Sequence, residues 1–290
     1  MSGATSITKD SSLASFPQGS HDSWQFHFFS FELNRAFSVR FWSSESVKHA
    51  WAWTAEMGSA SPNSATMISH LSKCDFSHPD GTCTVAREAS SPASSFKFTE
   101  LSPISHSGSL SVIVSGAEEL HIDFAPGSLQ FWGVPGRNEG VFHFPDLSAK
   151  ISFRGVTTDA IGYCKRYFGD YTGPWGYQFI QGIASNKSAS VWTADATFGD
   201  DEYNYFKIYD IENKSITAGL PAETYHNNLR GFWKEKEIEL TEKAKMEFHL
   251  KSDHQYSKLV ERFGTIEMKQ NGKTVWRGLG FNEKCFGTVG

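Results

Sequence analysis

The sequence lacks the features that mark several common classes of protein. No run of apolar residues approaches the roughly 20 residues that a membrane-spanning helix needs. The first residues, MSGATSITKDSSLASF, are polar and contain no apolar core of a secretory signal. No basic run occurs and the net charge is -5, which argues against a nucleic-acid surface. We therefore expect neither an integral membrane segment nor a nucleic-acid partner.

Cysteine is scarce, with 4 residues in the chain, and does not decide the cellular compartment. Cys74 and Cys83 bracket the loop CDFSHPDGTC, which an oxidising compartment could close as a disulfide. Asn186 and Asn213 begin glycosylation-type triplets, which Ser-rich chains also produce by chance. We expect a cytoplasmic protein, with the secretory pathway as the alternative if a signal peptide has been removed.

Motifs for metal, nucleotide and nucleophilic chemistry are also missing. The 11 histidines are scattered, and no HxH or HExxH spacing occurs. No GxSxG elbow surrounds a serine, so a nucleophilic triad has no recognisable scaffold. The segment GLGFNE lacks the strand-to-helix context and the spacing of a dinucleotide loop. We therefore expect no bound metal and no cofactor.

Aromatic residues and turn residues, in contrast, are abundant. Aromatic content is 14% and hydrophobic content is 39%. The chain also contains 25 glycines, a number that fits a turn-rich all-β protein. Short strand-like runs recur along the 290 residues, a length that suits two domains. The strand pattern loosens between residues 145 and 162, where we place a junction. We predict two all-β barrels in tandem, residues 1–157 and 158–290, with one helix at residues 257–263.

Two segments show the alternation of side chains that is typical of strands. In SWQFHFFSFEL, Trp24 and Phe26 face one way and Gln25 and His27 face the other. In GYCKRYFGDYTGPWGYQF, residues 162–179, two tyrosines and a lysine share one strand face, and an aromatic strand follows the turn. An aromatic face with hydroxyl and ammonium donors suits a pocket for a large apolar molecule. Ordinary core packing of the aromatic residues is the alternative interpretation.

Three segments resemble those of a known family. The pattern Gly-Tyr, four residues, Phe-Gly and then Pro-Trp resembles the signature that opens the second domain of lipocalin-like two-domain proteins. That family includes carotenoid hydratases of the hydroxyneurosporene synthase type, tocopherol cyclases and fungal Diels–Alderases. The segment SHDSWQFHFFSFE resembles the first strand of these proteins, and WRGLGFNEKCFG is similar to their closing segment. Their signature usually reads G-Y-x-D/E-H/K-N-W-G, and Lys165, Arg166, Tyr167 and Phe168 replace four of its residues here.

The resemblance implies two lipocalin-like β-barrels that hold a hydrophobic small molecule, of polyene, terpenoid or quinone-methide type, between or inside them. It implies a cofactor-free pericyclase for a Diels–Alder or hetero-Diels–Alder [4+2] cycloaddition in fungal natural-product assembly. A non-catalytic lipid or terpenoid carrier and an isoprenoid hydratase or cyclase are the alternatives. The candidate residues are the donors Tyr163, Lys165 and Tyr167 for catalysis, and Trp24, Phe26, Trp175, Tyr177 and Gln178 for substrate binding.

Overall fold

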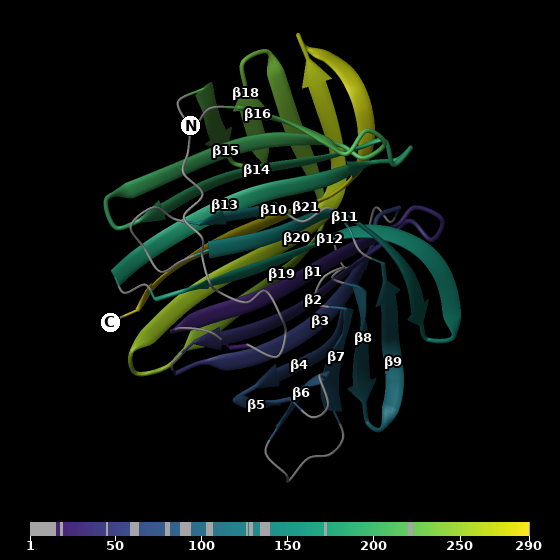
Figure 1. The fold of residues 1–290 in the computed structure, drawn as a ribbon, viewed down its shortest axis with the longest axis vertical. Coiled ribbons are helices and arrows are strands. Elements are labelled where there is room, and N and C mark those ends of the chain that lie inside the picture. Colours follow the sequence, from purple (N-terminus) through teal and green to yellow (C-terminus); the bar gives the residue numbers. More distant parts are fainter. Residues whose placement is uncertain are drawn as a thin grey trace.

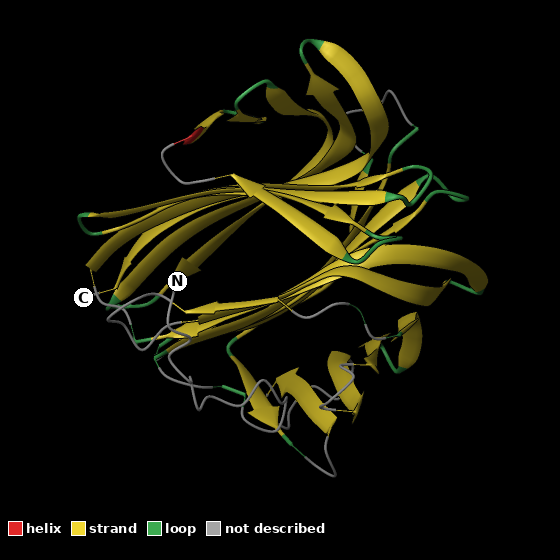
Figure 2. Ribbon diagram, turned by 45° about the horizontal axis from the view of Figure 1, so that its top comes forward, coloured by secondary structure: helices red, strands yellow, loops and turns green. Residues whose placement is uncertain are grey.

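The protein is built almost entirely from β-strands that form two sheets (Figures 1 and 2). No α-helix occurs among the residues that the computed structural model describes, and hence no helix that is long and apolar enough to cross a membrane. The described residues are 16–17, 20–44, 46–58, 64–78, 82–87, 94–102, 107–125, 127, 130–133, 140–170, 173–219 and 223–289.

The first sheet contains twelve strands from the N-terminal half of the chain. They are β1 (His21–Ser30), β2 (Arg35–Ser44), β3 (Lys48–Glu56), β4 (Ala65–Ser72), β5 (Cys74–Ser77), β6 (Thr82–Arg87), β7 (Ser94–Ser102), β8 (Ser107–Val114), β9 (Ala117–Phe124), β10 (Gln130–Gly133), β11 (Gly140–Phe153) and β12 (Val156–Gly169). Their order is β4-β3-β2-β1-β12-β11-β9-β8-β7-β6-β5, with β10 on β11. Contacts of β4 with β6, β7 and β8 bring the two ends of this sheet together.

The second sheet contains nine strands from the C-terminal half. They are β13 (Gly173–Ala184), β14 (Ala189–Phe198), β15 (Asp201–Asp210), β16 (Ser215–Gly219), β17 (Thr224–Asn227), β18 (Arg230–Trp233), β19 (Lys236–Lys251), β20 (Gln255–Gln270) and β21 (Lys273–Val289). Their order is β16-β15-β14-β13-β21-β20-β19-β18-β17. Because β14 and β15 contact β17, this sheet also curls back on itself. The all-β prediction of two barrel domains is therefore confirmed.

The chain passes from the first sheet to the second between Gly169 and Gly173. Strand β12 pairs with both β1 and β11, so the expected boundary after residue 157 falls inside a strand of the first sheet. The pairing of β11 with β12 shifts register between Phe144 and Leu147, at the Pro145 position where the strand pattern loosens. Proline cannot donate to a ladder and is found at bulges, which explains why the sequence suggested a junction there.

The helix that we predicted at residues 257–263 is wrong, because this segment lies in the long strand β20. It pairs along its length with β19 and β21. Ser257, Leu259, Glu261 and Phe263 are all buried, which is the period of a strand. In the sequence, Glu261 interrupts the alternation of apolar residues that indicates a strand. A charged residue at such a position is also expected on the polar face of an amphipathic helix.

The two sheets face each other (Figure 2). The buried side chains between them form a cluster of their own. Alternate residues of β1 point to opposite sides: Trp24 and Phe26 join the core of the first barrel, whereas Phe29 joins the layer between the sheets. A separate cluster fills the second barrel. Cys74 and Cys83 are both buried and are not joined to each other, so the disulfide that the sequence left open is not formed in this structure.

Candidate functional site

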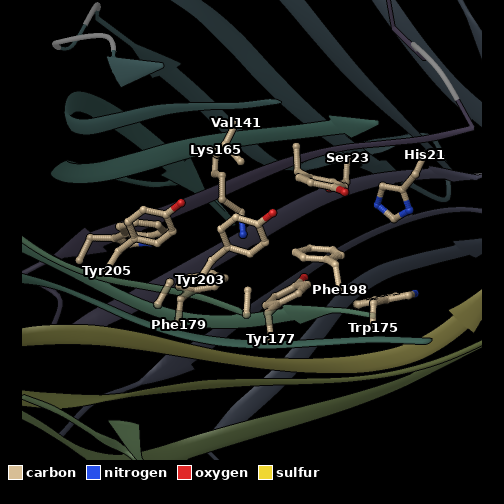
Figure 3. A pocket seen from close by; sticks show the side chains of 14 residues that line it. His21, Ser23, Val141, Lys165, Trp175, Tyr177, Phe179, Phe198, Tyr203 and Tyr205 are labelled. Carbon is tan, nitrogen blue, oxygen red and sulfur yellow. The ribbon is translucent and has the colours of Figure 1, made fainter. Parts of the chain in front are cut away.

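A cavity of about 100 Å³ lies between the two sheets (Figure 3). Strands β1, β11 and β12 of the first sheet form one side, and β13, β14 and β15 of the second sheet form the other. The first sheet contributes polar side chains, namely His21, Ser23, Lys165 and Tyr167. The second sheet contributes mainly aromatic rings and small alanines. The cavity therefore has one polar wall and one apolar wall.

Strand alternation produces both walls. Ser23 lies opposite Tyr167 in the antiparallel pairing of β1 and β12, so their side chains share one face of the first sheet. On β13 the rings of Trp175, Tyr177 and Phe179 stack in a row, with centroids 5.7 and 6.2 Å apart and interplanar angles of 18°. This row gives the cavity a flat aromatic wall that fits an unsaturated apolar molecule.

Lys165 projects its ammonium group into this aromatic surrounding (Figure 3). Its Nζ lies 3.9 Å from the ring centroid of Phe179 and 5.2 Å from that of Tyr177. The side chain is 7% exposed and makes no hydrogen bond or ion pair with any described residue. Burial lowers the pKa of Lys165 from 10.5 to about 8, although the negative charge of Glu283 acts in the opposite direction. Lys165 therefore brings an unused hydrogen-bond donor to the cavity.

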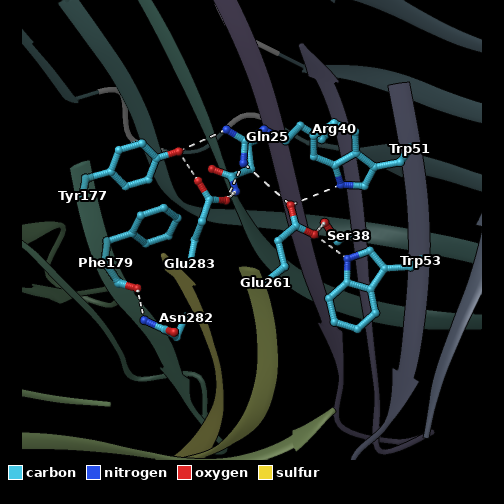
Figure 4. A network of polar contacts seen from close by, with 10 residues as sticks. All are labelled: Gln25, Ser38, Arg40, Trp51, Trp53, Tyr177, Phe179, Glu261, Asn282 and Glu283. Atoms are coloured by element: carbon cyan, nitrogen blue, oxygen red, sulfur yellow. Dashed lines mark hydrogen bonds and ion pairs between the residues drawn. The ribbon is translucent and has the colours of Figure 1, made fainter. Parts of the chain in front are cut away.

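Behind the aromatic wall, a carboxylate holds Tyr177 in place (Figure 4). Glu283 on β21 accepts hydrogen bonds from Gln25, Arg40 and the hydroxyl of Tyr177. Arg40 also donates to the Tyr177 hydroxyl oxygen, at 3.2 Å. Burial raises the pKa of Glu283, but the charges of Arg40 and Lys165 outweigh burial and leave the pKa lowered. Because the Tyr177 hydroxyl already donates to Glu283, it shapes the wall and is not available as a donor to a ligand.

A second carboxyl group, that of Glu261, lies on the other side of Arg40 (Figure 4). Its oxygens accept hydrogen bonds from the indole nitrogens of Trp51 and Trp53 and from the hydroxyl of Ser38. Its Oε1 lies 3.7 Å from Nη1 of Arg40. Burial raises the pKa of Glu261 to about 7, and the negative charge of Glu283 adds to this effect. The two carboxyls therefore share one buried guanidinium that links the two sheets.

Four of the predicted site residues come together at the cavity: Lys165, Tyr167, Trp175 and Tyr177. Tyr167 stacks on Phe198 from the second sheet, with centroids 6.2 Å apart. Lys165 and Tyr167, which the sequence places on one strand face, therefore lie on the same wall of the cavity.

The structure does not bring the other predicted residues to this cavity. Trp24 and Phe26 lie on the opposite face of β1, where they pack inside the first barrel. Tyr163 is fully buried deeper between the sheets, against the rings of His27 and His143. Gln178 lies on the face of β13 opposite to the aromatic row and does not line the cavity.

Sequence reasoning missed the charged residues of the layer between the sheets, above all Arg40, Glu261 and Glu283. Two of them carried a signal. Glu283 is the acidic residue of the segment GFNEKC, and Arg40 alternates with buried apolar residues in AFSVRFW. A charged residue inside an alternating apolar strand indicates either an exposed face or a buried ion pair, and burial here selects the second.

Comparisons with known proteins identify the fold. No family model and no curated protein matches the sequence. Kievitone hydratase from Nectria haematococca is 12% identical, with a TM-score of 0.54 over 98% of this chain and 95% of that chain. CghA, a Diels–Alderase, is 9% identical, with a TM-score of 0.56 over 93% of this chain and 88% of that chain. These likenesses show a lipocalin-like fold.

The same fold occurs in CghA with Sch210972, at 10% identity and a TM-score of 0.55 over 93% of this chain and 88% of that chain. At such identities the likeness extends to the fold and not to individual side chains. Among the described residues, no group of three or more His, Cys, Asp or Glu is placed to hold a metal ion. The chemistry that the cavity can perform depends on the side chains that line it.

Proposed function

We propose that this chain is an enzyme, a cofactor-free pericyclase that catalyses a [4+2] cycloaddition of an apolar polyene or terpenoid with a carbonyl group. One observation carries the proposal: Lys165 presents an unused donor inside a cavity whose opposite wall is a row of stacked aromatic rings. The likeness to CghA, a Diels–Alderase, supports it at the level of the fold.

The aromatic wall would hold the flexible substrate in its reactive conformation. A cycloaddition needs diene and dienophile at close approach, and well-oriented approach contributes up to about 7–11 kcal/mol in favourable cases. Trp175, Tyr177 and Phe179 offer flat faces for an extended unsaturated chain. The hydrogen bond from Tyr177 to Glu283 fixes the middle ring, so the wall keeps its shape when the substrate enters.

Lys165 would donate a hydrogen bond to the carbonyl that activates the dienophile. With a pKa of about 8 the group is mostly an ammonium at neutral pH, and its burial against aromatic rings strengthens its interaction with developing negative charge. Tyr167 lies two residues along the same strand face. In a hetero-Diels–Alder reaction that begins with loss of water, its hydroxyl would act as the acid.

A hydratase or cyclase is the second candidate. It is supported by the likeness to kievitone hydratase and by the carboxyl of Glu261, whose pKa of about 7 suits a general acid. However, Glu261 is enclosed by Trp51 and Trp53 and does not line the cavity. A substrate in the cavity would meet Lys165 and Tyr167 instead, and this favours cycloaddition.

The test is to incubate the purified protein with polyenes that carry a tethered or separate dienophile and to follow rate and product stereochemistry. We expect acceleration and a single stereoisomer, and a loss of about 10²–10³-fold for Lys165→Met, as for removal of one preorganised donor. Lys284→Met, at an exposed position on β21, is the matched control and should keep the rate. Binding without any acceleration would instead indicate a carrier.

A further inference from the structure

The amine of Lys165 has the surroundings of a nucleophile as well as those of a donor. Its Nζ is held against the faces of Phe179 and Tyr177, and no described carboxylate reaches it within ion-pair distance. The carboxylate of Glu283 instead accepts hydrogen bonds from Arg40, Gln25 and Tyr177. Lys165, the one lysine among the described residues that line the cavity, is therefore desolvated without being neutralised by a salt bridge. Lysines in hydrophobic pockets are the ones that attack carbonyl carbons.

We propose that Lys165 captures the aldehyde or ketone of a conjugated apolar molecule as a reversible imine. The lone pair of Nζ forms a bond to the carbonyl carbon, and a proton moves from nitrogen to oxygen to give a carbinolamine. Loss of water then leaves a C=N bond, and hydrolysis reverses the step. No oxidant or further reactant is needed. The inference rests on the proposed function for the apolar, carbonyl-bearing substrate, but the covalent bond can be tested without any cycloaddition.

Two properties of the surroundings favour this bond. First, a lysine whose pKa is about 8 is roughly one-tenth neutral at pH 7, whereas an ordinary lysine is neutral only to a few parts in ten thousand. Second, the negative charge of Glu283 acts on the same nitrogen and would stabilise the protonated imine. A protonated imine withdraws electrons more strongly than a carbonyl, which is the activation that a dienophile requires.

The experiment uses cinnamaldehyde, a conjugated aromatic aldehyde, with the full chain at pH 7. Cyanoborohydride delivers hydride to the imine carbon and converts C=N into a stable secondary amine, which peptide mass mapping locates. We expect labelling of Lys165 to exceed that of the exposed Lys284 by about tenfold or more, because neutral amine is more abundant there. Lys165→Arg keeps a cation but cannot form the imine, so its labelling should vanish. Lys284→Arg should leave the Lys165 adduct unchanged.

The outcomes separate this inference from the proposed function. Absence of a Lys165 adduct in the wild-type protein, or equal labelling of Lys165 and Lys284, overturns the inference even if cycloaddition is accelerated. A Lys165 adduct in a protein that accelerates no cycloaddition supports the inference and counts against the pericyclase. Circular dichroism of Lys165→Arg establishes that lost labelling reflects the lost amine, and cinnamaldehyde labelling of the other lysines in this variant serves as the internal standard.

Discussion

The hydroxyl of Tyr177, a half-buried side chain between the two sheets, donates a hydrogen bond to the fully buried carboxylate of Glu283. Tyr177 lines the cavity, whereas Glu283 lies behind it on the neighbouring strand. Arg40 of the first sheet donates to both groups. The orientation of a cavity wall in the second barrel thus depends on a cation supplied by the first. The ion pair therefore links packing of the two sheets to the shape of the site.

Replacement of Glu283 should destabilise the whole molecule. In Glu283→Gln the carboxylate charge is lost and Arg40 keeps only the more distant Glu261 as a counter-charge. Breaking a buried ion pair by removing one partner costs about 3–5 kcal/mol, because the remaining charge stays buried. Urea unfolding followed by tryptophan fluorescence measures this loss. Glu247→Gln removes an exposed partner of Lys245 and Lys258 and should change stability by about 0.5 kcal/mol or less. Equal stability of the two variants would contradict the prediction.

Glu261 should make stability depend on pH in a direction opposite to that of ordinary carboxyls. Its pKa in the folded protein is about 7 and that of an unperturbed glutamate is 4.5, so the folded state holds a proton that the unfolded state releases between these values. The stabilisation is fully present below pH 4.5 and is lost as pH rises to about 7.

The measurement compares unfolding free energies of the wild type and Glu261→Gln across this range. Other titrating groups act in both proteins, so the difference between them isolates the pair formed by Glu261 and Glu283. We expect the wild type to lose stability relative to Glu261→Gln as pH rises from 4.5 to 7. A difference that stays constant, or that changes in the opposite direction, would show that folding does not raise the pKa of Glu261.

Strand alternation made much of the fold and half of the site predictable. The period of two placed Lys165 and Tyr167 on one face of β12, and the structure has both at the cavity. The same rule separated Trp24 and Phe26 from Gln25 and His27, and the two sets do lie on opposite sides of β1. Alternation does not indicate which of the two buried faces of β1 contacts the second barrel. For this reason Trp24 and Phe26, which the sequence predicts as substrate-binding residues together with Trp175, lie in the core of the first barrel instead.

The buried charges could not be predicted for a different reason. Arg40 lies on β2, far in the sequence from Glu261 and Glu283, which face each other on the paired strands β20 and β21. The buried guanidinium offsets the repulsion between the two buried carboxyls. Read singly, each indicates an exposed strand face or, for Glu261, a helix. Long-range pairing of this kind is a property of the assembled sheets, which a local pattern does not contain.

The hydroxyl of Tyr163 should be dispensable, which now distinguishes it from Tyr167. It is fully buried and has no hydrogen-bond partner among the described residues, and it does not line the cavity. Tyr163→Phe removes an unsatisfied polar group and should be neutral or stabilising by up to about 1 kcal/mol, with unchanged turnover. Tyr167→Phe should lower turnover in a hetero-Diels–Alder assay. Thermal unfolding and initial rates measure both effects. If the Tyr163→Phe enzyme is slower but of normal stability, the Tyr163 hydroxyl takes part in catalysis and the prediction is wrong.

Replacement of Trp175 should change the products of the reaction rather than only the stability of the fold. Its ring stacks on Tyr177 and on Trp42, with centroids 5.7 and 6.3 Å apart, and it forms one end of the aromatic wall. Trp175→Phe leaves space in that wall, so the substrate can bind in more than one conformation and the stereochemical purity of the product should fall. Each tryptophan-to-phenylalanine change should also cost about 1–3 kcal/mol of stability through lost burial.

The matched control for Trp175 is Trp24→Phe, because Trp24 is equally large and buried but packs inside the first barrel. We expect a comparable loss of stability in urea unfolding and a product ratio identical to that of the wild type, since no wall of the cavity has changed. Chiral chromatography of the products from both variants, at matched conversion, measures the ratio. If Trp24→Phe alters the stereochemistry as much as Trp175→Phe does, the substrate is bound inside the first barrel and the cavity between the sheets is not the site of reaction.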